Sequence, residues 1–284
     1  MQENDLFARH IRAQFTDTIW EKFVEGIRTY HLLEPGDRVC VCISGGKDSM
    51  LLAKLMQMLE AEGTSDITVR YLIMDPGYNP ENREKVEENA RLLGIPYTLF
   101  ESDIFAVANH QEKNPCFLCA RMRRGFLYAR AQEMGCNKIA LGHHFDDVIG
   151  TTLLSMFYGG QLQAMLPRLK ARNFPGMELI RPLYLVHEED IIRWRDAMHL
   201  TFIQCACRFT EESERRGETH TDSKRLEVKR LLKELRRTHP DVEENLFRSL
   251  HHLELDTMVG WKYKGRTYSF LDMYDMRDGK ETEA

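Results

Sequence analysis

The hydrophobic pattern of this chain changes period several times, and each change predicts a different element. Apolar residues recur about once per helical turn over 6–30, which predicts an amphipathic N-terminal helix. Short apolar runs typical of buried strands follow at 39–43, 67–74, 97–100, 138–141 and 177–183. Helical patterns lie between and after these runs, over 50–56, 80–93, 117–134, 146–158 and 187–198.

This alternation is typical of βαβ units, so we predict an α/β fold with a parallel sheet of about five strands flanked by helices. The turn residues 35–37 separate an N-terminal helical region, 1–34, from a catalytic domain, 35–208. Beyond that boundary the pattern is charged and helical, which predicts a C-terminal extension over 209–284 with a disordered tail.

One motif stands at the end of the first predicted strand. Residues 44–49 read Ser-Gly-Gly-Lys-Asp-Ser and precede an apolar helix. A strand, a glycine turn and a helix N-terminus surround an anion with backbone N–H groups, and Lys47 adds a positive charge. The P-loop of kinases needs a glycine where this chain has Val41, so that loop is excluded. The alternative is a Gly-Gly turn in which Ser44 or Asp48 merely caps the helix.

Other polar residues also follow predicted strands. Asp75 comes after the second strand, and Gly142, His143 and His144 come after the fourth. Ligands of parallel sheets bind beyond the carboxyl ends of the strands. We therefore expect these residues to meet the phosphate loop at one edge of the sheet.

The composition of the chain limits where the protein can be located and what its cysteines can do. The 284 residues are 43% apolar, yet no uncharged apolar run is long enough to span a membrane. The first residues lack the pattern of a secretory signal, so we expect a cytoplasmic protein whose seven cysteines are thiols or metal ligands. The net charge of −5 does not indicate a general nucleic-acid binder, but basic residues cluster at 121–124, 168–172 and 224–237. These clusters suggest local phosphate contacts, although the last also fits a solvated helix face.

Four of the seven cysteines form two closely spaced pairs. Cys116 and Cys119 make a C-x-x-C pair at a predicted helix start, and Cys205 and Cys207 lie far downstream. Four thiolates could hold a structural zinc, whereas three could hold an iron–sulfur cluster that leaves one iron open. A redox pair of the thioredoxin type is a third interpretation. The remaining three cysteines, Cys40, Cys42 and Cys136, are interpreted as core residues.

Three stretches together resemble one family. Residues 44–49, 116–125 and 138–160 are similar to the tRNA 2-thiocytidine synthetases, members of the adenine-nucleotide α-hydrolase-like superfamily. The stretches at 180–183 and 188–192 continue the resemblance, which covers roughly residues 20–260.

The resemblance implies an ATP-dependent tRNA thiolase. ATP binds with Mg²⁺, the C2 carbonyl oxygen of an anticodon-loop cytidine attacks the α-phosphate, and pyrophosphate leaves. Sulfur, supplied with the help of a 4Fe-4S cluster, then displaces AMP. The implied partners are tRNA, a sulfur donor (a cysteine desulfurase or sulfide) and a second copy in a homodimer.

The resemblance also implies roles for individual residues. Asp48 or Asp147 helps to hold Mg²⁺, while Asp146 or Asp147 could instead cap a helix. His143 and His144 contact nucleotide or base, or simply pack. Residues implied in nucleotide binding are Ser44, Gly45, Gly46, Lys47, Asp48, Ser49, Asp75, Gly142, His143 and Asp147. Those implied in catalysis are Lys47, Asp48, Cys205 and Cys207, and those implied in cluster binding are Cys116, Cys119 and Cys205.

One stretch departs from the family pattern. The family has Pro-Cys-Asn-x-Cys-Gly where this chain has Gln-Cys-Ala-Cys-Arg at 204–208. Alignment on Ile203 favours Cys205 as the third ligand and leaves Cys207 as a candidate sulfur carrier. Three alternatives remain: a thiolase of the 2-thiouridine type, a persulfide-based thiolase with structural zinc, and a nucleotide-binding RNA protein without catalysis. No other C-x-x-C pair exists, which favours the cytidine branch.

Overall fold

The computed structural model describes residues 5–63, 66–102, 115–203 and 222–274, with backbone alone at 115–121, 222–223 and 273. The chain divides into two compact units, residues 1–229 and 230–284. The domain boundaries expected at 34/35 and 208/209 stay predictions.

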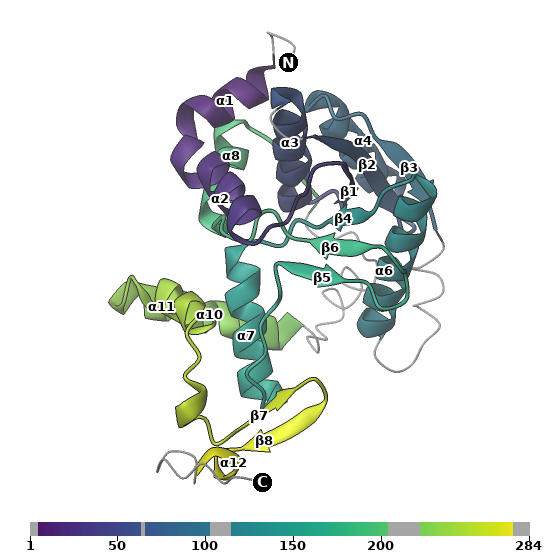
Figure 1. Cartoon of the computed structure of the whole chain (residues 1–284). Coiled ribbons are helices and arrows are strands. Elements are labelled where there is room, and N and C mark those ends of the chain that lie inside the picture. Colours follow the sequence, from purple (N-terminus) through teal and green to yellow (C-terminus); the bar gives the residue numbers. More distant parts are fainter. Residues whose placement is uncertain (1–4, 64–65, 103–114, 204–221, 275–284) are drawn as a thin grey trace. The chain divides into compact units, whose positions relative to one another are not determined.

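The first unit is built on one six-stranded sheet (Figure 1). Its strands are β1 (Asp37–Ile43), β2 (Ile67–Asp75), β3 (Thr98–Glu101), β4 (Lys138–Ala140), β5 (Arg168–Lys170) and β6 (Glu178–Ile180). They lie in the order β3-β2-β1-β4-β6-β5, and every neighbouring pair is parallel except β5 with β6. The predicted α/β fold is confirmed, and β5 is an additional antiparallel edge strand that the sequence pattern missed.

Helices cover both faces of this sheet because β1 is apolar on both sides. Val39, Val41 and Ile43 pack with α3 (Lys47–Glu62), α4 (Pro80–Leu92) and α8 (Glu188–Ala197). The alternating residues Cys40 and Cys42 face the other way, toward α6 (Pro115–Glu133). Successive residues of a strand point to opposite faces, so a continuous apolar run predicts this two-sided burial.

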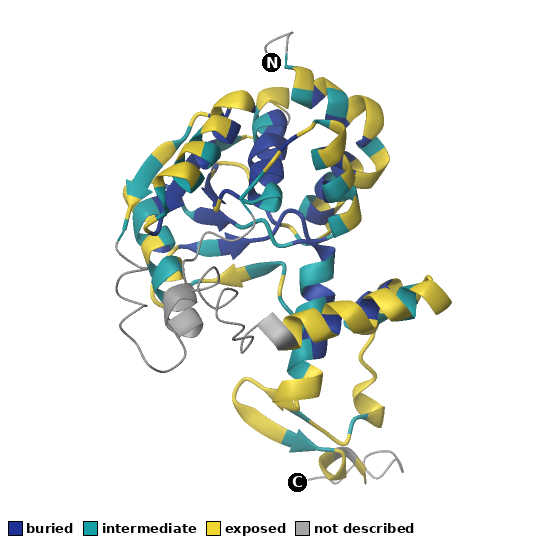
Figure 2. Cartoon of the chain, turned by 180° about the vertical axis from the view of Figure 1, so that it is seen from behind, coloured by how far each residue is buried: buried dark blue, intermediate teal, exposed yellow. Residues whose placement is uncertain are grey.

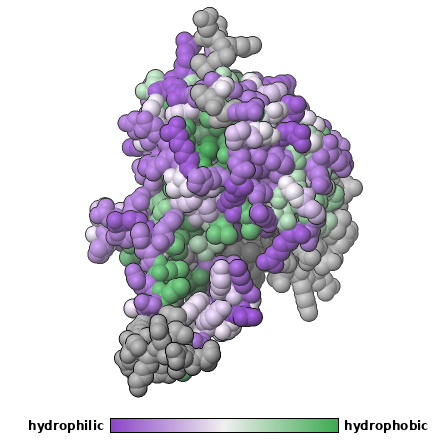
Figure 3. All heavy atoms as spheres, in the orientation of Figure 1, coloured by the Kyte–Doolittle hydropathy of each residue, from purple (hydrophilic) through white to green (hydrophobic). Residues whose placement is uncertain are grey.

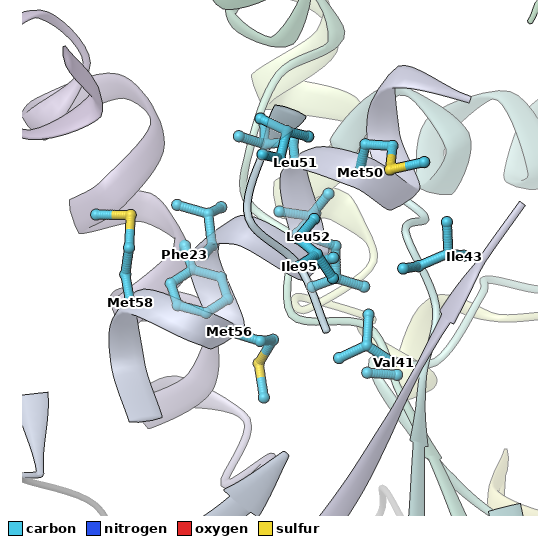
Figure 4. Close-up of a cluster of buried hydrophobic side chains, with 14 of the residues drawn as sticks. Phe23, Val41, Ile43, Met50, Leu51, Leu52, Met56, Met58 and Ile95 are labelled. Carbon is cyan, nitrogen blue, oxygen red and sulfur yellow. The ribbon is translucent and has the colours of Figure 1, made fainter. Parts of the chain in front are cut away.

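The larger cluster has α3 at its centre (Figure 4). Met50, Leu51, Leu52 and Met56 are completely buried, as is Phe23 of the N-terminal helices. Figure 2 shows the same helix as part of the buried interior. Burying each such side chain stabilises the fold by about 1.5–3 kcal/mol relative to exposure, so this packing holds α3 against the sheet.

The predicted N-terminal helix is interrupted. It forms α1 (Leu6–Gln14), a π-helical turn at Thr16–Trp20 and α2 (Glu21–Thr29). Phe15 leaves helical geometry, with φ −129° and ψ 26°, and is itself buried. The break keeps Ile11, Ile19 and Phe23 fully buried on one side of the segment.

The surface of the first unit is mainly hydrophilic in the coloured part of Figure 3, with smaller apolar patches. The last turn of α7 (Phe145–Gly159) is one place where large apolar residues are exposed, at Met156, Phe157 and Tyr158. Within the described ranges, no helix combines the length and the apolar content that crossing a membrane requires.

The second unit contains the end of α10 (Asp222–Thr238), α11 (Val242–Ser249), the strands β7 (Gly260–Tyr263) and β8 (Arg266–Ser269), and α12 (Leu271–Tyr274). The predicted helices are confirmed, but the hairpin was missed. Lys264 and Gly265 at its turn both have positive φ, 47° and 80°, which is the geometry of a type I′ turn.

Candidate active site

The loop at residues 44–46 has the geometry that its sequence predicts. It joins the end of β1 to the start of α3, and Gly45 has φ +83°. A Cβ atom at Gly45 would lie 2.4 Å from Val86 and 2.6 Å from Ile203, so both conformation and space require glycine.

Ser49 holds the loop in shape. Its hydroxyl oxygen accepts hydrogen bonds from the Ser44 N–H and the Ser44 hydroxyl, both at 3.1 Å, and donates to the Gly46 carbonyl at 2.9 Å. The Tyr78 hydroxyl donates to the Ser44 carbonyl at 3.0 Å. The loop is therefore preorganised by contacts from α3 and from the segment after β2.

The end of β4 closes against this loop. A Cβ atom at Gly142 would lie 3.0 Å from the carbonyl carbon of Asp48 and from the Ser49 nitrogen. Only a residue without a side chain fits this approach unless the backbone shifts. The expectation that residues after β1 and β4 meet at one edge of the sheet is confirmed.

A pocket of about 340 Å³ opens at that edge. Six of the residues implied in nucleotide binding line it: Ser44, Asp48, Ser49, Gly142, His143 and Asp147. Gly45, Gly46, Lys47 and Asp75 are not among its lining residues. The remaining lining residues are Cys42, Ile43, Met74, Arg123, Arg124, Leu127 and Leu141.

Lys47 lies between two carboxylates. Its ammonium is 3.0 Å from Asp48 Oδ1 and 3.1 Å from Glu188 Oε1. Burial lowers the pKa of Lys47, but the charges of Asp48 and Glu188 outweigh it and raise the pKa above the usual value. Lys47 is thus a cation beside the loop, and Glu188 is a partner that motif analysis left without a role.

The two aspartates that begin α7 both bind backbone N–H groups. Asp147 Oδ2 accepts from the His144 N–H at 3.1 Å, and Asp146 Oδ2 accepts from the Glu188 N–H at 2.7 Å. The carboxylate of Asp147 is also 39% exposed and lines the pocket. Capping and cation binding are compatible for Asp147, because one oxygen is enough for the cap.

His143 lies on the pocket wall in a positive environment. Burial, and next the charge of Arg181, lower its pKa to about 4. Its Nδ1 atom has no hydrogen-bond partner among the described residues. A neutral imidazole with an unused nitrogen can donate to, or accept from, a bound nucleotide or base.

Asp75 shapes a turn. It is buried, and its Oδ1 atom accepts from the Gly77 N–H at 2.8 Å and from the Tyr78 N–H at 2.6 Å. The carboxylate therefore fixes the backbone after β2, and a border of the adenine pocket at this place stays a prediction.

Two arginines contribute to the pocket wall, and a third lies near them. Arg123 and Arg124 of α6 line the pocket. Arg181 is buried, and burial followed by the charge of Arg124 lowers its pKa to about 10. The stretch 180–183 resembled the family, but neither spacing nor composition placed Arg181 beside α6.

A second basic cluster has a structural role. Arg168 of β5 donates to Glu178 of the neighbouring strand β6 at 2.7 Å and to Glu34, in the segment before β1, at 2.9 Å. Its guanidinium is therefore paired with carboxylates, and a phosphate contact at 168–172 stays a prediction.

The described residues include only part of the cysteine set. Cys116 and Cys119 are one turn apart in the backbone at the start of α6, and Cys205 and Cys207 lie outside the described residues. Cys40, Cys42 and Cys136 are buried free thiols, as predicted. The hydrogen bond that Cys136 donates to Cys40, and next burial, raise the pKa of the Cys136 thiol, so it remains protonated at neutral pH. Among the residues that the structure describes, no three His, Cys, Asp or Glu side chains lie together in a way that could hold a metal ion.

Comparison with known proteins identifies the family. The model of the PP-loop domain matches residues 14–215. The chain belongs to the PP-loop family. Among curated relatives, a tRNA-cytidine(32) 2-sulfurtransferase of Anaeromyxobacter dehalogenans (strain 2CP-C) is 39% identical over 232 residues, which is 81% of this chain and 77% of that protein. The protein of the same name from Neisseria gonorrhoeae (strain NCCP11945) is 38% identical over 209 residues, 72% of this chain and 62% of its own length.

A solved structure shows the same fold. The U34-tRNA thiolase NcsA from Methanococcus maripaludis, determined with its [4Fe-4S] cluster, superposes with a TM-score of 0.62 at 22% identity. The match covers 82% of this chain and 79% of that chain. The expected enzyme class, an ATP-dependent tRNA thiolase of the PP-loop family, is confirmed by the curated relatives and the matched domain.

Proposed function

We propose that this PP-loop enzyme converts an anticodon-loop cytidine of tRNA to 2-thiocytidine. The observation that carries the proposal is that one pocket is lined by the phosphate loop and by α6, the helix that begins at the cysteine pair. ATP and the sulfur chemistry would thus act on a single base. Relatives named for cytidine(32) support the choice of nucleoside.

The chemistry follows from the poor reactivity of a ring carbonyl. The C2 oxygen of cytidine attacks the α-phosphorus of ATP, the bond to the bridging oxygen breaks, and pyrophosphate leaves. The base then carries AMP on that oxygen. A sulfur nucleophile attacks C2, and AMP departs with the former carbonyl oxygen.

The loop residues stabilise the charge that moves onto the phosphates. Lys47 and the N–H groups of Gly45, Gly46 and the first turn of α3 donate toward the phosphate oxygens. Asp48 and Asp147 present carboxylates at the pocket, and they would hold the Mg²⁺ that accompanies ATP. Ser44 and Ser49 keep the loop in the required shape.

The thiols of Cys116, Cys119 and Cys205 would hold a 4Fe-4S cluster. Three thiolates are a donor set that fits such a cluster and leaves one iron without a protein ligand. When bound, the cluster supplies an iron at which sulfide can be carried. A cysteine desulfurase or free sulfide would serve as donor, Cys207 would carry sulfur in a persulfide route, and the working form would be a homodimer.

The test is thiolation of tRNA by anaerobically purified protein with ATP, Mg²⁺ and sulfide. We expect 2-thiocytidine in the digested tRNA by mass spectrometry, and about four irons per chain. Cys116→Ser should lose iron and activity, whereas Cys207→Ser should keep its iron.

Each contrary result points elsewhere. A product of 2-thiouridine would refute the choice of cytidine. Stoichiometric zinc, together with activity that is lost only in Cys207→Ser, would refute the 4Fe-4S cluster and support a persulfide-based thiolase with structural zinc.

A further inference from the structure

The carboxylate of Glu188 lies between two lysines from distant parts of the chain. Its Oε1 atom is 3.1 Å from the ammonium of Lys47, beside the phosphate loop. Its Oε2 atom is 3.1 Å from the ammonium of Lys229, on the basic helix α10. One carboxylate thus connects Lys47 to Lys229, and all three residues belong to the first compact unit.

The backbone holds Glu188 in this position. It is the first residue of α8, and its N–H donates to Asp146 at the start of α7 at 2.7 Å. This anchor uses the main chain, so it persists when the side chain of residue 188 changes. The side chain of Glu188 is 23% exposed and that of Lys229 is 62% exposed, so salt screens the second ion pair more than the first.

The carboxylate of Glu188 is ionised at neutral pH. Burial alone would raise the pKa of Glu188, but Lys47, His144 and Lys229 lower it to about 2. Any anion that binds Lys47 must therefore compete with a carboxylate that is already ionised and in contact.

We propose that Glu188 is a positioning residue that competes with ATP phosphates for Lys47, and that Lys229 weakens this competition by sharing the carboxylate. Without the Lys229 contact, Glu188 would form an ion pair with Lys47 only. The carboxylate would then offset more of the positive charge that Lys47 offers to phosphate. The contact between Lys229 and Glu188 in this way affects the affinity of the loop for phosphate. The inference rests on the proposed role of Lys47 as a phosphate ligand.

The test is a mutant cycle read by binding of α,β-methylene-ATP with Mg²⁺, which cannot be cleaved at the reacting bond. Glu188→Gln removes the charge and keeps the shape, and we expect two- to fivefold tighter binding, the size of a partly screened ion pair. Lys229→Met should weaken binding by about the same factor, whereas Lys229→Arg should bind as the wild type does. In the double variant the effect of Lys229→Met should disappear.

Matched variants separate the possible failures. Lys233→Met, on the same helix and exposed, should leave the affinity unchanged at the same salt concentration. Weaker binding by Glu188→Gln, or an equal effect of Lys229→Met in both backgrounds, would overturn the inference. Lys47→Met tests the underlying role: if it binds the analogue normally, the proposed phosphate site is wrong, independently of Glu188.

Discussion

His143 illustrates how single residues of this site depend on their neighbours. The imidazole is surrounded by protein, close to Arg181 and Arg124, and its pKa falls to about 4 from a usual value of 6.5. The folded protein therefore keeps it neutral at pH values where the unfolded chain protonates it. A neutral side chain is available to a bound base over the whole physiological range.

This shift predicts a pH dependence of stability. Because the unfolded state binds more protons between pH 6.5 and 4, the contribution of His143 is fully present above 6.5 and declines as the pH falls. When the pH is lowered from 7 to 5, we expect the free energy of unfolding to fall more in the wild type than in His143→Asn. The difference between the two decreases should be on the order of 1 kcal/mol. Urea titrations at both pH values measure it.

The exposed His252 is the matched control for that experiment. His252→Asn should follow the wild-type curve. Parallel curves for the wild type and His143→Asn would show that His143 titrates normally.

Residue-scale prediction succeeded where a motif carries its own geometry. Six adjacent residues identified the phosphate loop, because glycine conformations and a helix start are local properties. Glu188 and Arg181 were not assigned roles, since Lys47 and Arg124, the charged groups near them, are far away in sequence. A lone charged residue does not indicate which residues will surround it.

At the scale of elements, the strand beginnings are joined by buried charges. Lys138 of β4 is completely enclosed, with its ammonium 2.6 Å from Asp37 of β1 and 3.7 Å from Glu178 of β6. It also donates to the Leu32 carbonyl at 2.9 Å. This network lies at the end of the sheet opposite the phosphate loop and fixes the neighbouring strands in register.

Replacing Lys138 by Met should therefore destabilise the fold strongly. The change leaves the buried carboxylate of Asp37 without its cation, whereas Glu178 keeps its ion pair with Arg168, and we expect a loss of about 3–5 kcal/mol in the free energy of unfolding. Urea unfolding measures this loss, and Lys170→Met on the exposed edge strand should change stability by less than about 0.5 kcal/mol. A loss as small as that of Lys170→Met would mean that the network does not hold the strands together.

Elements with long, regular patterns were predicted well. The helices at 80–93, 117–134, 146–158 and 187–198 correspond to α4, α6, α7 and α8 within two residues at each end. The three-residue strand β5 was interpreted as a basic patch, because so short a segment shows no period. The break near Phe15 was missed since the apolar spacing continues across it.

At the scale of the whole molecule, positive and negative charges are unevenly distributed along the chain. The protein is acidic overall, yet α10 exposes Arg225 and Lys233, whereas Lys229 is engaged by Glu188. A polyanionic RNA substrate needs such local positive surface, because the net charge does not attract it.

Charge reversal on α10 tests that use. Arg225→Glu with Lys233→Glu should weaken tRNA binding roughly tenfold at low salt and reduce the slope of log affinity against log salt by about one to two, since counterion release falls with each lost phosphate contact. Filter binding over a salt series measures both. Arg193→Glu, on α8 and equally exposed, serves as control, and an unchanged slope in the α10 variant would make this helix a solvated face.

The sequence by itself determined the α/β class, the phosphate loop and the family, because apolar periods, glycine turns and contiguous motifs are encoded locally. Only the tertiary structure decided that α6 and the loop line one pocket and that Arg168 forms ion pairs with carboxylates. It also decided that Glu188 forms ion pairs with both Lys47 and Lys229. These are contacts between residues that are far apart in sequence and are brought together by folding, and their energy depends on burial and distance. Neither quantity can be obtained from the order of residues along the chain.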